Sequence, residues 1–297
     1  MLNSLAPQPF NLVFAHLSQW EAVMHSTLDK RTARQHAAHV KRYLWQAGIQ
    51  HVSEITPASI QDYTAYLVSQ AGYAPATVRN QHSAIANLCN YLISRGFMTQ
   101  NPCERVQLPR VPRPIVNYLT PDEVEQALAL AEYLRIGLSV KVAIYTGLRR
   151  AELASLQWPN IHFENRILVV RGKQAKVRSL PIHDAIYPIL AVIASTCGSK
   201  GWVFPNTHND GPMTLNRWTS RLKPLQAVMP QISGWHIFRH TFASLLAQQG
   251  VSLVKIAEWL GHSSQELTRK YYVNLAPERY DADINRLTLR EGENYGQ

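Results

Sequence analysis

Apolar residues recur every three or four positions in four segments of the first hundred residues. These segments are 10–24, 32–48, 56–72 and 74–96. Such spacing is typical of amphipathic helices, and three of the four segments end in Gly, the residue that most often follows a helix. Thr56 followed by Pro57 fits a helix N-cap with Pro at the first helical position. The pattern predicts a compact helical bundle.

A proline-rich stretch follows these segments. Four prolines lie between Pro102 and Pro114, without helical or strand periodicity, which is typical of an extended, semi-rigid linker. The chain restarts at Thr120, where Thr-Pro-Asp-Glu fits a capping box. We therefore predict a helical domain over 1–104, a linker over 105–118 and a second domain over 119–297.

Residues 161–182 alternate apolar and polar side chains instead of showing helical spacing. The alternation breaks at 164–165 and again at 172–175, which predicts three short strands in a small antiparallel sheet. The rest of the second domain looks helical, and it ends in a tail helix expected over 276–290, with Ile284 and Leu287 on one face. The predicted fold class is mostly α with a small antiparallel β-sheet.

The charge balance points to a class of partner. The chain has 30 Lys+Arg against 20 Asp+Glu, a formal net charge of +10, which favours a polyanion such as nucleic acid. Basic residues gather on the second helical segment, where a DNA-facing surface and an ordinary solvated face are both open interpretations. The candidate DNA contacts are Arg34, Lys41, Arg79, Arg171 and Lys176.

Several sequence features are absent, and each absence excludes a class of protein. No run of about 18 apolar residues occurs, and the N-terminus does not resemble a secretory signal, so we expect a cytoplasmic, nucleoid-associated protein without a membrane partner. Cys89, Cys103 and Cys197 fit neither a disulfide framework nor a zinc site, and we expect buried or idle thiols. Because phosphate-loop and metal-ligand motifs are also missing, no cofactor or metal site is expected.

The segment TGLRRAEL, residues 146–153, combines an arginine with a predicted helix start. Arg149 lies in the first turn, close to backbone N–H groups, and Glu152 follows three residues on. An arginine in this position can hold a phosphate by two parallel hydrogen bonds, and the glutamate can orient it. From this segment alone, an ordinary surface ion pair is the simpler interpretation.

Further candidates follow along the chain. His236 and Arg239 are spaced i, i+3 near a predicted helix N-terminus, where they form a compact anion-binding surface. His240 is expected to pack or cap rather than react. His262 follows a helix-ending Gly and alone means little. Lys173 lies in the hairpin turn, where a solubilising basic turn and a cation that reaches a DNA phosphate both fit.

Taken together, these motifs resemble the tyrosine recombinase (phage integrase) family. TGLRRAEL, GKQAKVRSLPI, HIFRHTFASLLAQQG and IAEWLGHSS all match, in the family's order and at plausible spacing. The resemblance covers both domains, a helical core-binding (SAM-like) domain and a catalytic domain. Since the chain begins almost directly with the first of these, the resemblance favours a two-domain, Xer-like or Cre-like architecture.

The resemblance implies a site-specific recombinase that cleaves and rejoins duplex DNA through a 3′-phosphotyrosyl intermediate, in integration, excision or resolution of a mobile element or replicon. Arg149 and Arg239 would clamp the non-bridging phosphate oxygens, and His262 would add a hydrogen-bond donor. Glu152 would steady the site. The covalent linkage preserves the bond energy, so neither ATP nor a divalent ion is needed.

The resemblance also implies the proton-transfer groups and the nucleophile. His236 would bond the phosphate or help take the tyrosine's proton, and Lys173 would protonate the leaving 5′-oxygen. The nucleophile lies nine or ten residues after His262 in different members, which leaves Tyr271 and Tyr272. We prefer Tyr272, because the following VNLAP fits many members without a gap, and keep Tyr271 as the alternative.

As partners, the resemblance implies double-stranded DNA with a specific site, a homotetramer on two DNA sites, and an accessory protein or a second recombinase. The tail helix is expected either to dock on a neighbouring protomer or to fold back on its own domain. Three other functions stay open: a relaxing enzyme like a type IB topoisomerase, a telomere-resolving enzyme, and a DNA-binding regulator that does not cleave.

Overall fold

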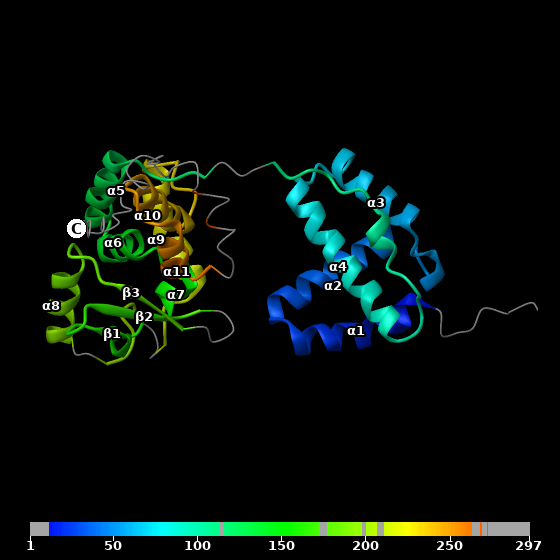
Figure 1. Cartoon of the computed structure of the whole chain (residues 1–297), viewed down its shortest axis with the longest axis horizontal. Helices are drawn as coiled ribbons and strands as arrows, with labels where there is room; N and C mark the ends of the chain where they lie inside the picture. Colours follow the sequence, from blue (N-terminus) through cyan, green and yellow to red (C-terminus); the bar gives the residue numbers. More distant parts are fainter. Residues whose placement is uncertain are drawn as a thin grey trace, which may run out of the picture. The chain divides into compact units, whose positions relative to one another are not determined.

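The computed structural model describes residues 12–112, 116–172, 177–197, 200–206, 211–262, 268 and 272 (Figure 1). The chain divides into two compact units, Met1–Pro112 and Arg113–Gln297. The division lies within the stretch expected as a linker, 105–118. The expected tail helix lies outside the described residues.

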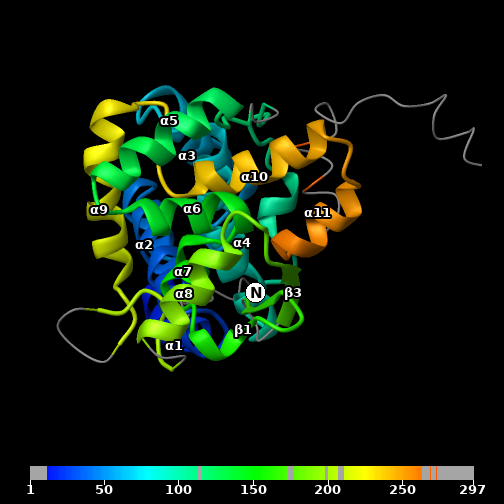
Figure 2. The same ribbon diagram turned by 90° about the vertical axis from the view of Figure 1, so that its left-hand side faces the viewer.

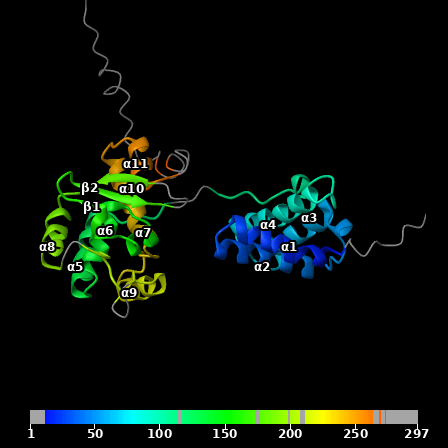
Figure 3. The same ribbon diagram turned by 90° about the horizontal axis from the view of Figure 1, so that it is seen from below.

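The first unit is a helical bundle, as predicted (Figure 1 and Figure 3). Its elements are α1 Val13–Thr27, α2 Lys30–Gln46, α3 Pro57–Ser69, α4 Pro75–Ser94 and short 3₁₀ helices at Val52–Glu54 and Pro102–Arg105. The Thr56 side chain caps α3 in a capping box with Ser59. Trp20, Tyr43 and Leu88 are fully buried between the helices, and each burial of this size stabilises the bundle by about 1.5–3 kcal/mol.

Part of the expected linker is bonded to this bundle. The backbone N–H of Gln107 donates to Gln61 Oε1 at 2.8 Å, and Arg79 Nε donates to the carbonyl of Pro109 at 3.0 Å. These contacts fix the residues that follow Arg105 against α3 and α4.

The second unit is mostly helical with one small sheet, which confirms the predicted fold class. Its elements are α5 Pro121–Tyr133, α6 Gly137–Thr146, α7 Arg150–Ala154, a 3₁₀ helix at Trp158–Asn160, β1 Ile161–His162, β2 Ile167–Arg171, β3 Val177–Pro181, α8 Tyr187–Cys197, α9 Leu215–Val228, α10 His236–Gln248 and α11 Leu253–Leu260. In the part of the chain that the structure describes, no helix is long and apolar enough to cross a membrane.

The sheet has the order β1-β2-β3 and is antiparallel throughout, as the alternation predicted. Leu168 pairs with Leu180, and both are buried on the inner face. Arg178 precedes Leu180 by two residues, so its side chain points to the same inner side. This register decides where Arg178 lies in the site.

Helix α10 is the central element of the second unit. It packs against α6 and α11, and α11 in turn lies against β3 (Figure 2). Trp235 and Phe238 are buried and join Trp218 of α9 in edge-to-face contacts. The opposite side of α10 contributes Ala243 to a smaller buried cluster that includes Tyr272. The arrangement brings the ends of α6 and α11 next to the first turn of α10.

Candidate active site

A tight turn between α6 and α7 positions Arg149. Gly147 has φ +60°, and a Cβ atom there would lie 2.5 Å from Phe242 Cδ1, so the turn requires glycine. Arg149 is the N-cap of α7. Glu152 accepts hydrogen bonds from the Arg149 backbone N–H at 2.8 Å and from Arg149 Nη1 at 2.9 Å. The predicted pairing of Arg149 with Glu152 is therefore present, at a partly buried position.

Arg178 is a further member of the site that the sequence analysis missed. Its two terminal nitrogens donate to the two carboxylate oxygens of Glu152 at 2.9 and 2.8 Å, and its Nε donates to the carbonyl of Trp259 at 2.7 Å. Its side chain is 9% exposed and that of Glu152 is 6% exposed. The signal that could have found it is the strand period of two, which places Arg178 on the same face of β3 as the buried Leu180.

Glu152 is held in its charged form between the two arginines. Burial alone would favour the protonated carboxyl, but the hydrogen bonds and charges of Arg178 and Arg149 outweigh it and lower the pKa of Glu152. Two cations thus share one carboxylate, which leaves a net positive charge at this edge of the second unit.

Arg239 of α10 is the third arginine of the site, and like Arg149 it donates to backbone carbonyls of the surrounding turns. It is 5% exposed, and its Nη1 and Nη2 donate to the carbonyls of Gly147 at 2.8 Å and Leu260 at 2.7 Å. Arg149 Nη2 donates to the carbonyl of Gly261 at 3.0 Å. Burial and the charge of Arg149 lower the pKa of Arg239 to about 9, so the Arg239 guanidinium is still charged at neutral pH.

Two predicted histidines adjoin these arginines. His262 follows Gly261, whose φ of +64° ends α11, and its Nδ1 lies 2.6 Å from Thr268 Oγ1. Burial, Arg239 and Arg149 lower the pKa of His262 to about 4. His236 is exposed at the start of α10, and partial desolvation with the charges of Arg239 and Arg149 lowers its pKa as well. Both imidazoles are therefore neutral at pH 7.

Tyr272 lies beside this group but is buried. Its side chain is 1% exposed and its hydroxyl oxygen is 2.8 Å from His240 Nδ1. Because His240 directly follows Arg239 on α10, this contact places the Tyr272 hydroxyl next to the arginines of the site. His240, which the sequence analysis expects to pack or cap rather than react, contacts the candidate nucleophile. Tyr271 lies outside the described residues.

The other predicted site residues are dispersed. Lys173 and Lys176 lie outside the described residues. Arg34 and Arg171 are exposed, on α2 and at the end of β2, and Lys41 Nζ pairs with Glu21 Oε1 at 2.6 Å. Cys89 and Cys103 are buried free thiols, as expected. Among the described side chains, no group of three His, Cys, Asp or Glu residues could hold a metal ion.

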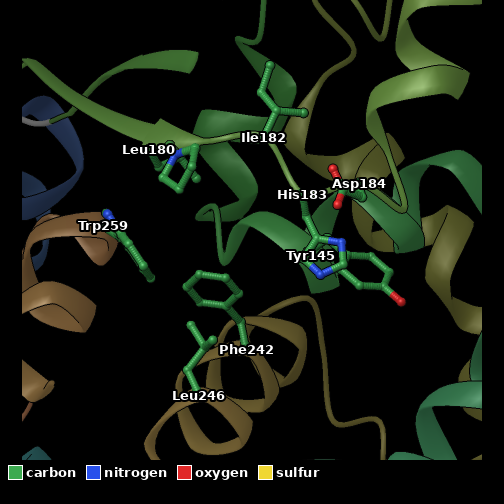
Figure 4. Close-up of a pocket in the computed structure, with 9 residues that line it drawn as sticks. Tyr145, Leu180, Ile182, His183, Asp184, Phe242, Leu246 and Trp259 are labelled. Carbon is green, nitrogen blue, oxygen red and sulfur yellow. The ribbon is translucent and has the colours of Figure 1, made fainter. Parts of the chain in front are cut away.

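A cavity of about 260 Å³ lies between the end of β3, α6, α10 and α11 (Figure 4). Its lining is mostly apolar, with Leu180, Phe242, Leu246 and Trp259 facing one another and His183 beside Tyr145. None of the three arginines Arg149, Arg178 and Arg239 lines it. The candidate active site is thus the polar group around Arg149 and Arg239, and the cavity is a separate, apolar feature.

Residues 117–279 match the phage integrase family, and residues 17–97 match its N-terminal SAM-like domain. The chain therefore belongs to the phage integrase family, and the sequence-based prediction of a tyrosine recombinase is confirmed. A tyrosine recombinase of Thermosipho africanus is 28% identical over 263 residues, which span 86% of this chain and 92% of the relative. Tyrosine recombinase XerD of Caulobacter vibrioides is 28% identical over 222 residues, 67% of this chain and 71% of its own.

The fold is also found among solved structures. The Tn1549 transposon integrase, in complex with a circular intermediate DNA, superposes with a TM-score of 0.73 at 18% identity, covering 94% of this chain and 100% of the other. A lambda integrase bound as a dimer to a core site gives 0.67 at 18% identity, covering 86% and 97%. Both likenesses concern the fold, and they agree with the helical architecture described above.

Proposed function

We propose that the chain is a site-specific DNA recombinase that cleaves and rejoins duplex DNA through a 3′-phosphotyrosyl intermediate. The observation that carries the proposal is the convergence of Arg149 and Arg239 on the turns that end α6 and α11, beside two neutral histidines. In phosphoryl transfer, charge grows on the non-bridging oxygens, and fixed cations stabilise it. Relatives named tyrosine recombinases support the same reaction.

The two arginines would act at different depths. Arg149 keeps 35% of its side chain exposed, whereas Arg239 is 5% exposed. An incoming phosphate would therefore meet Arg149 and the exposed His236 first. Arg239 would stabilise the oxygen that points into the protein. Because Glu152 and Arg178 hold Arg149 in place, little reorganisation would be needed as charge develops.

The proton transfers would use groups around the phosphate. Lys173 would protonate the leaving 5′-oxygen, as a lysine ammonium with a long side chain can do. His262 would donate a hydrogen bond to the phosphate from the nitrogen that does not contact Thr268. The phenol of Tyr272 would attack phosphorus and displace the 5′-oxygen. Since Tyr272 is 1% exposed in this structure, attack requires that its hydroxyl become accessible when DNA binds.

Double-stranded DNA is the partner that the charge and the family favour. Counterion release from phosphates supplies most of the affinity of such surfaces, and Arg34, Arg79 and Arg171 are exposed cations that could contribute. Recombination between two sites would require four protomers on two duplexes, with an accessory protein or a second recombinase as a further partner. The tail over 276–290 would then dock either on a neighbouring protomer or on its own domain.

A covalent selection from randomised DNA tests the reaction and finds the target sequence at the same time. The full chain is incubated, in EDTA, with nicked duplexes that carry a randomised segment, and DNA is recovered only from SDS-resistant protein adducts. We expect one sequence family to be enriched by the wild type and by the control His162→Ala, which changes an exposed histidine on β1. The variant Tyr272→Phe should give no adduct.

The outcomes separate the candidate functions. Loss of the adduct in Tyr271→Phe alone would keep the reaction and move the nucleophile by one residue. Tight binding of an enriched sequence without any adduct would refute cleavage and favour a DNA-binding regulator. Adducts with no enriched sequence would favour a relaxing enzyme like a type IB topoisomerase.

A further inference from the structure

The bond between His240 and Tyr272 points to a proton acceptor that the motif resemblance does not assign. We propose that His240 Nδ1 accepts the phenolic proton when Tyr272 attacks the DNA phosphate. The inference deepens the proposed recombinase function and rests on it. A nucleophile with a base within hydrogen-bond distance is the arrangement that activates a weak hydroxyl nucleophile, and here the distance is 2.8 Å.

The geometry on both sides of this bond is fixed by packing. His240 belongs to α10, directly after Arg239 and one turn after His236. The ring of Tyr272 packs in the buried cluster with Ala243 of the same helix and Leu260 of α11. Packing therefore constrains the ring of Tyr272, and helix α10 positions the side chain of His240. Their contact is not one between two exposed side chains.

The environment of His240 keeps its imidazole neutral, and a neutral imidazole can accept a proton. Among the described residues, the groups that face His240 include His236 and Arg239 on α10, His262 after α11, and Tyr272 itself. Burial, followed by the influence of His236 and Arg239, lowers the pKa of His240. The imidazole is thus neutral at pH 7, and with its proton on Nε2 its Nδ1 is an acceptor for the phenol.

The neighbouring His236 is suited to a different task. It is exposed at the start of α10 while His240 is turned inward, and the two ring centroids are 6.4 Å apart. A phosphate on the protein surface can reach His236, whereas Tyr272 is in contact with His240. His236 would therefore contact the phosphate, and His240, one turn later on the helix, would accept the proton of the nucleophile.

The proposed step balances. The O–H bond of Tyr272 breaks as its oxygen forms a bond to phosphorus, and the proton passes to His240 Nδ1, which becomes an imidazolium. The bond between phosphorus and the 5′-oxygen breaks, and that oxygen takes a proton from Lys173. In the rejoining step the 5′-hydroxyl attacks phosphorus and gives its proton back to the neutral Lys173 amine, the phosphotyrosine bond breaks, and the imidazolium returns its proton to the phenolate.

The pH dependence of cleavage distinguishes a base from a structural histidine. The probe is a nicked duplex of the selected sequence with sulfur in place of the scissile 5′-oxygen, because a thiolate leaves without protonation and the rate then reports on the nucleophile. The wild-type rate should be level from pH 7 to 9. Without a base, the rate follows the phenolate fraction, which is about 0.1% at pH 7 for a phenol pKa near 10.

We expect His240→Ala to cleave about 100- to 1,000-fold more slowly than the wild type at pH 7. The ratio of the wild-type rate to the His240→Ala rate should fall by about tenfold for each unit that the pH rises. His240→Gln, which keeps a hydrogen-bond acceptor but takes up no proton, should show the same slope. His162→Ala should match the wild type at every pH. Affinity for uncleaved DNA, measured in parallel, should be equal in all of these proteins.

Several results would overturn the assignment. An equal deficit at every pH would mean that His240 only supports the fold, and faster cleavage by His240→Ala would mean that the bond restrains Tyr272. An adduct that persists in Tyr272→Phe would remove the reason for a base at His240 but leave the recombinase function intact. No adduct from the wild type would overturn the function and this inference together.

Discussion

The buried ion pair between Arg178 and Glu152 should make a large electrostatic contribution to the stability of the second unit. Arg178→Met keeps the apolar part of the side chain but removes three hydrogen bonds of the guanidinium. Glu152, which is 6% exposed, then loses the residue that donates two hydrogen bonds to its carboxylate. Removing one member of a buried pair costs about 3–5 kcal/mol. Since Glu152 keeps its bonds to Arg149, we expect a loss near the lower end, about 3 kcal/mol.

Urea unfolding of the full chain, followed by tryptophan fluorescence, measures this loss. Trp218 and Trp235 are buried in the second unit, and its transition can be followed through them. The matched control is Asp184→Asn, because the pair of Asp184 with Arg166 belongs to the same hairpin region but is 85% exposed at the aspartate. Such a pair contributes about 0–1 kcal/mol. Equal losses of unfolding free energy in Arg178→Met and Asp184→Asn would show that the buried pair contributes no more to stability than the exposed one.

The pH dependence provides an internal check on the same variant. The pKa of Glu152 is lowered in the folded protein, so its stabilising effect is complete above its unfolded pKa, about 4.3. It is lost as the pH falls below that value through the folded pKa. The difference in unfolding free energy between wild type and Arg178→Met should therefore be constant from pH 5 to 7 and shrink below about pH 4.

Two further variants test the turn and the histidine. Gly147→Ala should destabilise the second unit by about 2–4 kcal/mol, since φ is +60° and its Cβ would lie 2.5 Å from Phe242 Cδ1; the control Gly201→Ala in the same unit, at φ +77° with nothing within 4 Å, should lose about 1–2 kcal/mol in the same urea assay. The folded pKa of His262, about 4, lies below its unfolded value, about 6.5. The unfolded chain thus binds more protons between these pH values, and stability falls as the pH drops through this window. His262→Gln should weaken this dependence, and an unchanged slope would contradict it.

The helical bundle and the sheet could be predicted because each is determined by local pattern. Thr56 and Thr120 cap their helices as the sequence indicated, and the break before Val177 separates β2 from β3. Local pattern also indicated the pairing of Arg149 with Glu152, three residues apart. These features do not depend on how distant segments pack.

The rest of the site depends on contacts between distant segments. Arg178 reaches Glu152 only because β3 lies against α11 and the sheet register turns residue 178 inward. The contact of His240 with Tyr272 spans 32 residues, and the sequence offered only its helical spacing from His236. The choice between Tyr271 and Tyr272 could not be made from spacing, since both fall within the family's range.

Strand exchange between two duplexes tests the central claim most directly. Two DNAs of different length, each carrying the sequence recovered by covalent selection, are incubated with the full chain in EDTA and without nucleotide, and the junctions are sequenced. The proposed function predicts recombinant molecules joined within that sequence by the wild type and by His162→Ala, and none by Tyr272→Phe. Cleaved and resealed parental DNA without recombinants would contradict recombination and favour a relaxing enzyme.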